Sequence, residues 1–164
     1  MGGSIDSESD GSKSAWVPAF AGMSGDTELL KYIITYLGTG VVFAALDAVY
    51  LTIAGSKVDR PTLDALLADT VNLPAAVAFY LMYILGVMLL AILPNKDAGL
   101  GKTARTGALL GAFAYATYDL TNQATLKIWA TRITLIDISW GTFLTCVGAS
   151  VGYLIWRWSA KRFG

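Results

Sequence analysis

Four long apolar stretches limit what this chain can fold into. They cover residues 29–53, 74–93, 106–129 and 133–158, and short polar segments separate them. Each stretch is close to the roughly 20 residues that an α-helix needs to cross the hydrocarbon core of a bilayer. A hydrophobic content of 55% and a mean hydropathy of +0.55 are high for a soluble domain and ordinary for a small membrane protein. We therefore predict an all-α membrane protein, built as a bundle of four transmembrane helices.

Missing residue types exclude several classes of function. The sequence has no His, which removes imidazole acid–base chemistry and most zinc, haem and di-iron sites, so we expect neither a metal nor a cofactor. Lys plus Arg and Asp plus Glu number 12 each, and this balance does not favour nucleic acid as a partner. The one cysteine, Cys146, lies in an apolar run, where burial disfavours a reactive thiolate.

The N-terminal segment has a different composition from the rest. Residues 1–25 are rich in Ser, Gly and Asp and lack apolar periodicity, so we expect a disordered tail rather than a signal peptide. Residues 14–23 resemble the peptide produced when a dispersed bacterial repeat element is read as coding sequence. On that interpretation residues 1–22 are not native and the working protein starts at Met23. The transmembrane domain is expected to cover residues 26–164.

The connecting segments and their charges predict an orientation. Pro61 is expected to open a short amphipathic turn of helix on the membrane surface, within residues 55–73. Residues 94–105 read as a short basic loop. Four spans put both termini and this loop on the same side, which carries more Lys and Arg than the opposite side. The positive-inside rule therefore predicts cytoplasmic termini.

Carboxylates interrupt three of the four apolar stretches. Asp119 and Asn122 lie three residues apart, on one face of the third predicted helix. Asp47 lies late in the first stretch, and Asp137 lies early in the fourth. The predicted topology places all three acids in the outer half of the bilayer, where an aspartate side chain is too short to travel far toward water. We therefore predict one hydrated polar pocket inside the bundle.

Several other polar and aromatic side chains are expected at the same depth. Lys127 supplies a cation that can pair with the acids, and Trp140 can form a wall of the pocket. The tyrosines of the second stretch share one helix face, and an aromatic belt at the membrane interface is the alternative interpretation for them. The candidate ligand-binding residues are Asp47, Tyr80, Tyr83, Tyr118, Asp119, Asn122, Lys127, Asp137 and Trp140.

Small residues at helical spacing predict close contacts between helices. Gly107 and Gly111 form a small-xxx-small motif, and Gly141, Gly148 and Gly152 recur along one face of the last stretch. Such stripes can pack helices within one chain or join two chains. Besides the lipid bilayer, the expected partners therefore include a second copy, as a homodimer, or a larger membrane complex.

Several motifs together resemble a known family. In chain order they are Asp47, Tyr80 with Tyr83 and Gly86, Gly107 to Gly111, Tyr115 to Asn122, Ala124 to Lys127 with Trp129, and Asp137 to Gly141. Over residues 29–158 the chain resembles the small bacterial membrane proteins grouped as domain of unknown function 2177. The resemblance implies an uncharacterised multi-pass protein of the bacterial inner membrane. It supplies no activity or catalytic residue, although frequent gene neighbours for cyclopropane-type fatty-acid modification imply a link to lipids.

Three functions stay open at this point. The acidic pocket can bind or transport a small cationic, proton-linked or lipid-derived ligand, which is the reading that the residues favour. A membrane enzyme or accessory factor in fatty-acid or lipid modification is the runner-up, with carboxylates, tyrosines and Lys127 as acids, bases or donors. A structural assembly subunit is the third, in which the polar cluster only fixes how the helices pack.

Overall fold

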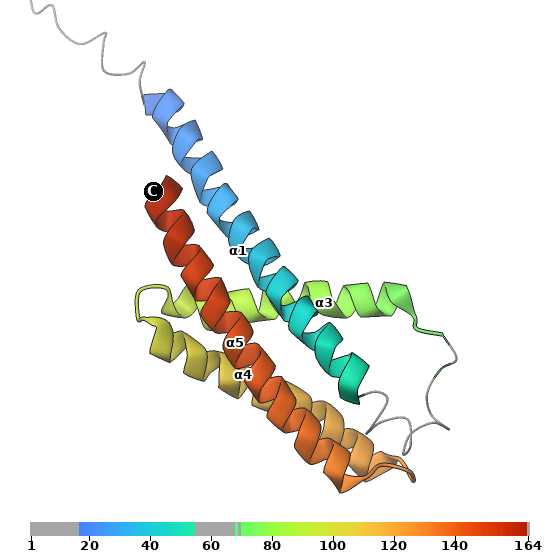
Figure 1. Cartoon of the computed structure of the whole chain (residues 1–164). Helices are drawn as coiled ribbons and strands as arrows, with labels where there is room; N and C mark the ends of the chain where they lie inside the picture. Colours follow the sequence, from blue (N-terminus) through green and yellow to red (C-terminus); the bar gives the residue numbers. More distant parts are fainter. Residues whose placement is uncertain (1–16, 55–67, 69, 164) are drawn as a thin grey trace, which may run out of the picture.

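The computed structural model describes residues 17–54, 68 and 70–163, and these ranges contain helices and no strand (Figure 1). The predicted all-α class is confirmed for this part of the chain. The amphipathic turn expected at Pro61 lies outside the described residues. In chain order the elements are α1 (Val17–Ala54), α3 (Leu73–Val87), the π-helical segment η3 (Met88–Ile92), the 3-10 turn η4 (Leu93–Asn95), α4 (Leu100–Thr125) and α5 (Thr131–Phe163).

Three of the described helical segments are long and apolar enough to cross a membrane. They are Gly25–Ile53, Leu73–Asn95 and Thr131–Phe163. Residues 106–125 of the third predicted span (106–129) belong to α4, which is helical over 26 residues but is not among these three. The crossing of the membrane by α4 therefore stays a prediction.

The first helix begins earlier than the sequence suggested. Residues 17–25, predicted as part of a disordered tail, form the first turns of α1. Pro18 lies in the first turn, where a helix tolerates proline because the missing N–H would have no intrahelical partner. The alanines at 19 and 21 favour helix, so the change in composition did not mark the helix start.

The basic loop predicted for residues 94–105 is also shorter than expected. The 3-10 turn η4 covers its first residues, and α4 begins at Leu100. Gly99 has a φ of 97°, a backbone conformation that favours glycine, and its carbonyl accepts the Thr103 N–H at 3.2 Å. The chain thus reverses direction over a few residues. Two cations of the predicted loop, Lys102 and Arg105, belong to the first turns of α4.

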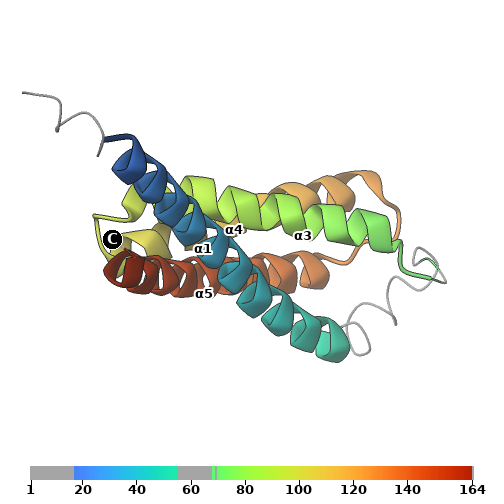
Figure 2. The same cartoon turned by 90° about the horizontal axis from the view of Figure 1, so that it is seen from above.

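Helix α5 is the centre of the bundle. Helix α4 packs antiparallel along one side of α5, and α1 packs along another (Figure 1). Helix α3 reaches the other helices largely through η3, which packs against both α4 and α5. In both views the start of α1, the C-terminus and the α3–α4 turn lie toward one end, and the α4–α5 turn lies toward the other (Figure 2). Which side of the membrane this end faces stays a prediction.

Glycines bring α4 and α5 into backbone contact. A Cβ atom on Gly107 would lie 2.8 Å from the carbonyl oxygen of Thr145. A Cβ atom on Gly111 would overlap the carbonyl oxygen of Gly141, and one on Gly141 would overlap the Tyr115 ring. These glycines therefore serve packing within one chain, and an interface with a second copy remains a prediction.

Apolar side chains cover both the inside and the outside of the bundle. On the outside, Val41 (69%), Met82 (72%) and Phe113 (70%) are largely exposed. Apolar side chains on the outer faces of long helices fit a surrounding lipid phase. Because lipid tails are as apolar as these side chains, burying them against protein would give no hydrophobic free energy. The inside is a small core between α1, α3, η3 and α5, formed by Phe43, Ile84, Val87, Ala91, Ile92, Leu144, Ala149 and Trp156.

Candidate functional site

Asp47 joins three helices. It lies on α1 and is buried, with 7% of its surface exposed. The Tyr80 hydroxyl of α3 donates to its Oδ2 atom at 2.6 Å, and the Trp140 indole N–H of α5 donates to its Oδ1 atom at 3.3 Å. Hydrogen bonds to a carboxylate are stronger than those between neutral groups, and they strengthen further where water is excluded. This acid therefore ties α1, α3 and α5 together.

Asp137 belongs to the same arrangement. The Tyr50 hydroxyl of α1 donates to the Oδ1 atom of Asp137 on α5 at 2.5 Å. The Tyr50 ring stacks on the Trp140 ring, with centroids 4.3 Å apart and planes at 7°. Since Trp140 also donates to Asp47, the two acids are linked through contacting side chains. We call Asp47, Tyr50, Tyr80, Asp137 and Trp140 the carboxylate network.

Asp119 lies beside this network on α4. Its side chain is fully buried, on the face of α4 that packs against α5. One turn earlier on the same face, the Tyr115 ring lies against Gly141. In antiparallel packing the next turn of α4 meets the preceding turn of α5, which places Asp119 level with Asp137. All three acids therefore lie in the same part of the bundle, and they come from three helices.

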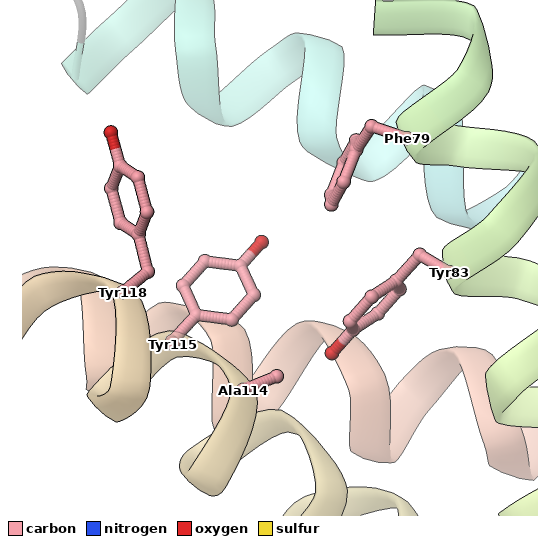
Figure 3. Close-up of a pocket in the computed structure, with 5 residues that line it drawn as sticks. All are labelled: Phe79, Tyr83, Ala114, Tyr115 and Tyr118. Carbon is pink, nitrogen blue, oxygen red and sulfur yellow. The ribbon is translucent and has the colours of Figure 1, made fainter. Parts of the chain in front are cut away.

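An aromatic groove opens between α3 and α4 (Figure 3). It contains a cavity of about 360 Å³ lined by Phe79, Tyr83, Ala114, Tyr115 and Tyr118. A neighbouring hollow of about 290 Å³ shares three of these residues and extends the groove along Met82, Gly86 and Leu110. We call the two together the α3–α4 groove. The groove exists because α3 itself makes little contact with α4, whereas the next segment, η3, packs closely against α4.

The rim of the groove is open, and its lining is mostly apolar with a few hydroxyl groups. Phe79 and Tyr118 at the rim are 43% and 62% exposed. At the floor, the Tyr83 hydroxyl forms a hydrogen bond of 2.8 Å with the Thr145 hydroxyl of α5. Figure 3 shows the Tyr115 hydroxyl pointing into the space between Tyr118 and Phe79. A ligand in the groove would thus meet aromatic rings at its sides and hydroxyl groups deeper in.

Tyr115 connects the groove to the acids. It lines the cavity, and its ring lies against Gly141, one turn of α5 after Asp137. Tyr80 and Tyr83 lie one turn apart on α3, and one bonds to the carboxylate network while the other lines the groove. The groove and the network are therefore adjacent surfaces of one site.

The structure brings most of the predicted site residues together and leaves two outside. Asn122 is half-buried, and its backbone carbonyl accepts the Leu126 N–H at 2.8 Å where α4 ends. Lys127 is exposed, and between described residues no ion pair joins it to an acid. The reason is that α4 ends at Thr125 and Leu126 is extended, so Lys127 lies in the turn and not on the predicted helix. Of the others, Asp47, Tyr80, Asp137 and Trp140 lie in the network, Tyr83 and Tyr118 in the groove, and Asp119 beside both.

Sequence reasoning missed several residues of the site. Tyr50 is three residues after Asp47, a spacing that puts both on one helix face and could have identified it. Phe79 was missed because phenylalanine has no polar or ionisable group that would mark it as a site residue in the sequence. Thr134 was also missed: its hydroxyl donates to Gln123 at 2.8 Å and accepts the Trp129 indole N–H at 3.0 Å, which fastens α4 to α5 at the turn.

Comparison with known proteins supports the resemblance seen in the sequence. No curated protein and no solved structure matches the chain. A family model described as "Predicted membrane protein (DUF2177)" matches residues 32–154. This range is most of the chain, and it includes the carboxylate network, Asp119 and the α3–α4 groove. The chain therefore belongs to the DUF2177 family of predicted membrane proteins.

Proposed function

We propose that this membrane protein binds a lipid-derived, amphipathic ligand in a bacterial inner membrane. The apolar part of the ligand would occupy the α3–α4 groove, and a cationic head group would lie toward the carboxylate network. The observation that carries the proposal is an open aromatic groove whose lining residue Tyr115 packs on α5 one turn from Asp137 of the carboxylate network.

The size and lining of the groove suit such a ligand. Ligand sites in proteins usually measure about 300–1,000 Å³ and are mostly apolar with a few polar groups. The cavity of about 360 Å³ and its neighbour of about 290 Å³ fall in this range as one continuous groove. Its polar groups are the hydroxyls of three lining tyrosines, Tyr83, Tyr115 and Tyr118, and that of Tyr83 bonds to Thr145 of α5.

The position of the groove suits entry from the bilayer. Its rim residues Phe79 and Tyr118 are exposed on the flank of the bundle, between two long helices. If both helices cross the membrane, this flank faces hydrocarbon. A lipid-derived molecule could then enter sideways without passing through water, which a purely hydrophilic solute could not do.

The partners of Asp47 suit a cationic head group. Its two hydrogen-bond partners, Tyr80 and Trp140, are neutral donors. A buried carboxylate is costly unless it is paired, so a ligand cation at this position would gain a strong interaction. The surrounding Tyr and Trp rings add cation–π attraction for an ammonium group.

Native mass spectrometry of the protein released from nanodiscs tests the proposal. Ala114 lines both hollows, so Ala114→Phe should fill the groove and lower the retained lipid. Ala45→Phe, at an exposed position on α1, is the matched control and should retain as much lipid as the wild type. Equal retention by the two variants would contradict a ligand in the groove.

A role in helix assembly is the second candidate, and one observation favours it. Both oxygens of Asp47 are already hydrogen-bonded to side chains of other helices. On this account the acid serves to hold the bundle together. On that account Asp47→Asn would lower the melting temperature without changing the selectivity for cationic lipids, whereas the binding proposal requires that selectivity to be lost.

A further inference from the structure

One face of α1 carries a row of buried polar side chains that leads away from the carboxylate network. Lys31, Thr35, Thr39 and Asp47 lie at multiples of four residues, and Phe43 occupies the remaining position, so the five form a buried stripe that winds slowly around the helix. Thr35, Thr39 and Phe43 are 0% exposed, and Lys31 is 6% exposed. We call these five residues the α1 row. It follows the helix over several turns, and apart from Asp47 its residues lie outside the proposed ligand site.

The hydroxyl groups of Thr35 and Thr39 differ from others in the helices. Hydroxyls in helices commonly donate to the carbonyl oxygen four residues earlier. Thr52, Thr117 and Thr142 all do so, at 2.6–2.7 Å. The hydroxyls of Thr35 and Thr39 are buried and have no hydrogen-bond partner in the described chain. Their side chains are thus turned away from their own helix backbone and toward the bundle interior.

The contacts of α1 with α5 show where these hydroxyls point. A Cβ atom on Gly152 would overlap the Thr39 hydroxyl, so this hydroxyl faces α5 where that helix has no side chain. Further toward the start of α1, the Tyr32 ring packs on the Trp156 ring at 5.1 Å. Thr35 lies between these two contacts. The Thr39 hydroxyl therefore faces the α1–α5 interface, and the buried Thr35 hydroxyl lies one turn away along α1.

Polar groups continue on the far side of Phe43. Its ring contacts the rings of Tyr83 and Tyr80, with centroids 5.2 Å and 6.4 Å away. The Tyr83 hydroxyl bonds to Thr145, and the Tyr80 hydroxyl bonds to Asp47. Phe43 is thus the one apolar residue of the α1 row, with hydroxyl groups on both sides of it.

Charged groups mark the opposite end of the row. The Lys31 ammonium pairs with the exposed Glu28 carboxylate at 2.5 Å. The Lys96 ammonium lies 5.6 Å from the centroid of the Trp156 ring at the same end. The row therefore runs from a charged group at the bundle end to a buried acid.

We infer that Thr35 and Thr39 bind internal water, and that this water forms a proton-conducting route from Lys31 toward Asp47, with Phe43 as its barrier. Burying a hydroxyl without a hydrogen bond costs free energy, because its hydrogen bonds to bulk water are lost. A bound internal water molecule replaces them. Two such hydroxyls one turn apart can share a water or hold two in sequence. Chains of hydroxyl groups and water transfer protons because each oxygen both donates and accepts. This inference does not depend on a ligand in the α3–α4 groove.

Proton flux into liposomes tests the route. The double variant Thr35→Val/Thr39→Val removes both hydroxyls with nearly the same volume, and Thr142→Val removes a half-buried hydroxyl that bonds to its own helix. Flux is driven by a potassium gradient with valinomycin and is read with a pH-sensitive dye inside the liposomes. The double variant should conduct about fivefold more slowly, the rate effect of one lost hydrogen bond, while Thr142→Val should match the wild type.

The melting temperature of the same proteins tests the water itself. If the hydroxyls bind water, the double variant should melt at a lower temperature than the wild type, because the water loses its partners. If they bind nothing, valine removes an unsatisfied buried group, and the melting temperature should rise. An unchanged or raised melting temperature overturns the water site. Wild-type flux equal to that of protein-free liposomes, or equal flux through the double variant, overturns the proton route.

Discussion

The two interfaces of α4 are built in opposite ways. Toward α5, Gly107 and Gly111 let the helix backbones touch, and no space is left. Toward α3, the helix presents Tyr115 and Tyr118, and a groove of about 360 Å³ lies between the helices. Small residues therefore close one side of α4, and large aromatic residues hold the other side open. The closed interface gives the rigid frame against which the open one can bind a ligand.

The largest effect is expected from a residue that closes the α4–α5 interface. In Gly111→Ala the new Cβ atom would overlap the Gly141 carbonyl oxygen and lie 2.6 Å from the Thr145 hydroxyl. The backbones must move apart, so we expect a loss of about 1–3 kcal/mol in the free energy of unfolding. Gly101→Ala is the control in the same helix, because nothing lies within 4 Å of its Cβ position. Equal unfolding free energies of the two variants in detergent would show that backbone contact does not hold this interface.

Removing Asp47 should have the next largest effect. Asp47→Ala leaves the Tyr80 hydroxyl and the Trp140 indole N–H without their acceptor. Leaving a buried donor unpaired costs about 1–3 kcal/mol, and both of these donors are half-buried, so we expect the free energy of unfolding to fall by about 2 kcal/mol. The double variant Asp47→Ala/Tyr80→Phe should recover part of this loss. If the loss in the double variant equals or exceeds the sum of the losses in the two single variants, the two residues do not form a pair.

A smaller effect is expected from loss of the hydrogen bond between Tyr50 and Asp137. Tyr50→Phe removes the hydroxyl that donates to Asp137 and keeps the ring that stacks on Trp140. We expect the free energy of unfolding to fall by about 1–2 kcal/mol, with Trp fluorescence unchanged. Tyr50→Leu, which also removes the stacked ring, should cost more and alter the Trp emission. Equal stability of the two variants would mean that ring stacking adds nothing to the network.

The sequence predicted the helices and the meeting of Asp47 and Asp137 better than it predicted the rest of the site, and the depth of these acids in a bilayer stays a prediction. Asp47 and Asp137 could be placed because helix length and direction set their depth before any contact is known. Lys127 was misplaced because the helix ends at Thr125, and apolar periodicity does not show where a helix stops. The groove could not be predicted, since it depends on the angle of α3 to α4. That angle follows from the packing of η3, a π-helical segment with no sequence signature.

The central claim is that a lipid-derived cation occupies the groove beside the carboxylate network. The most direct measurement is photolabelling in nanodiscs with a lipid that carries a quaternary ammonium head and a diazirine on its acyl chain. Mass spectrometry of the digested protein should place the label mainly on α3 and α4, near Phe79 and Tyr118, and Ala114→Phe should remove it. Label spread evenly over exposed residues such as Val41 and Phe113, and unchanged by Ala114→Phe, would contradict the claim.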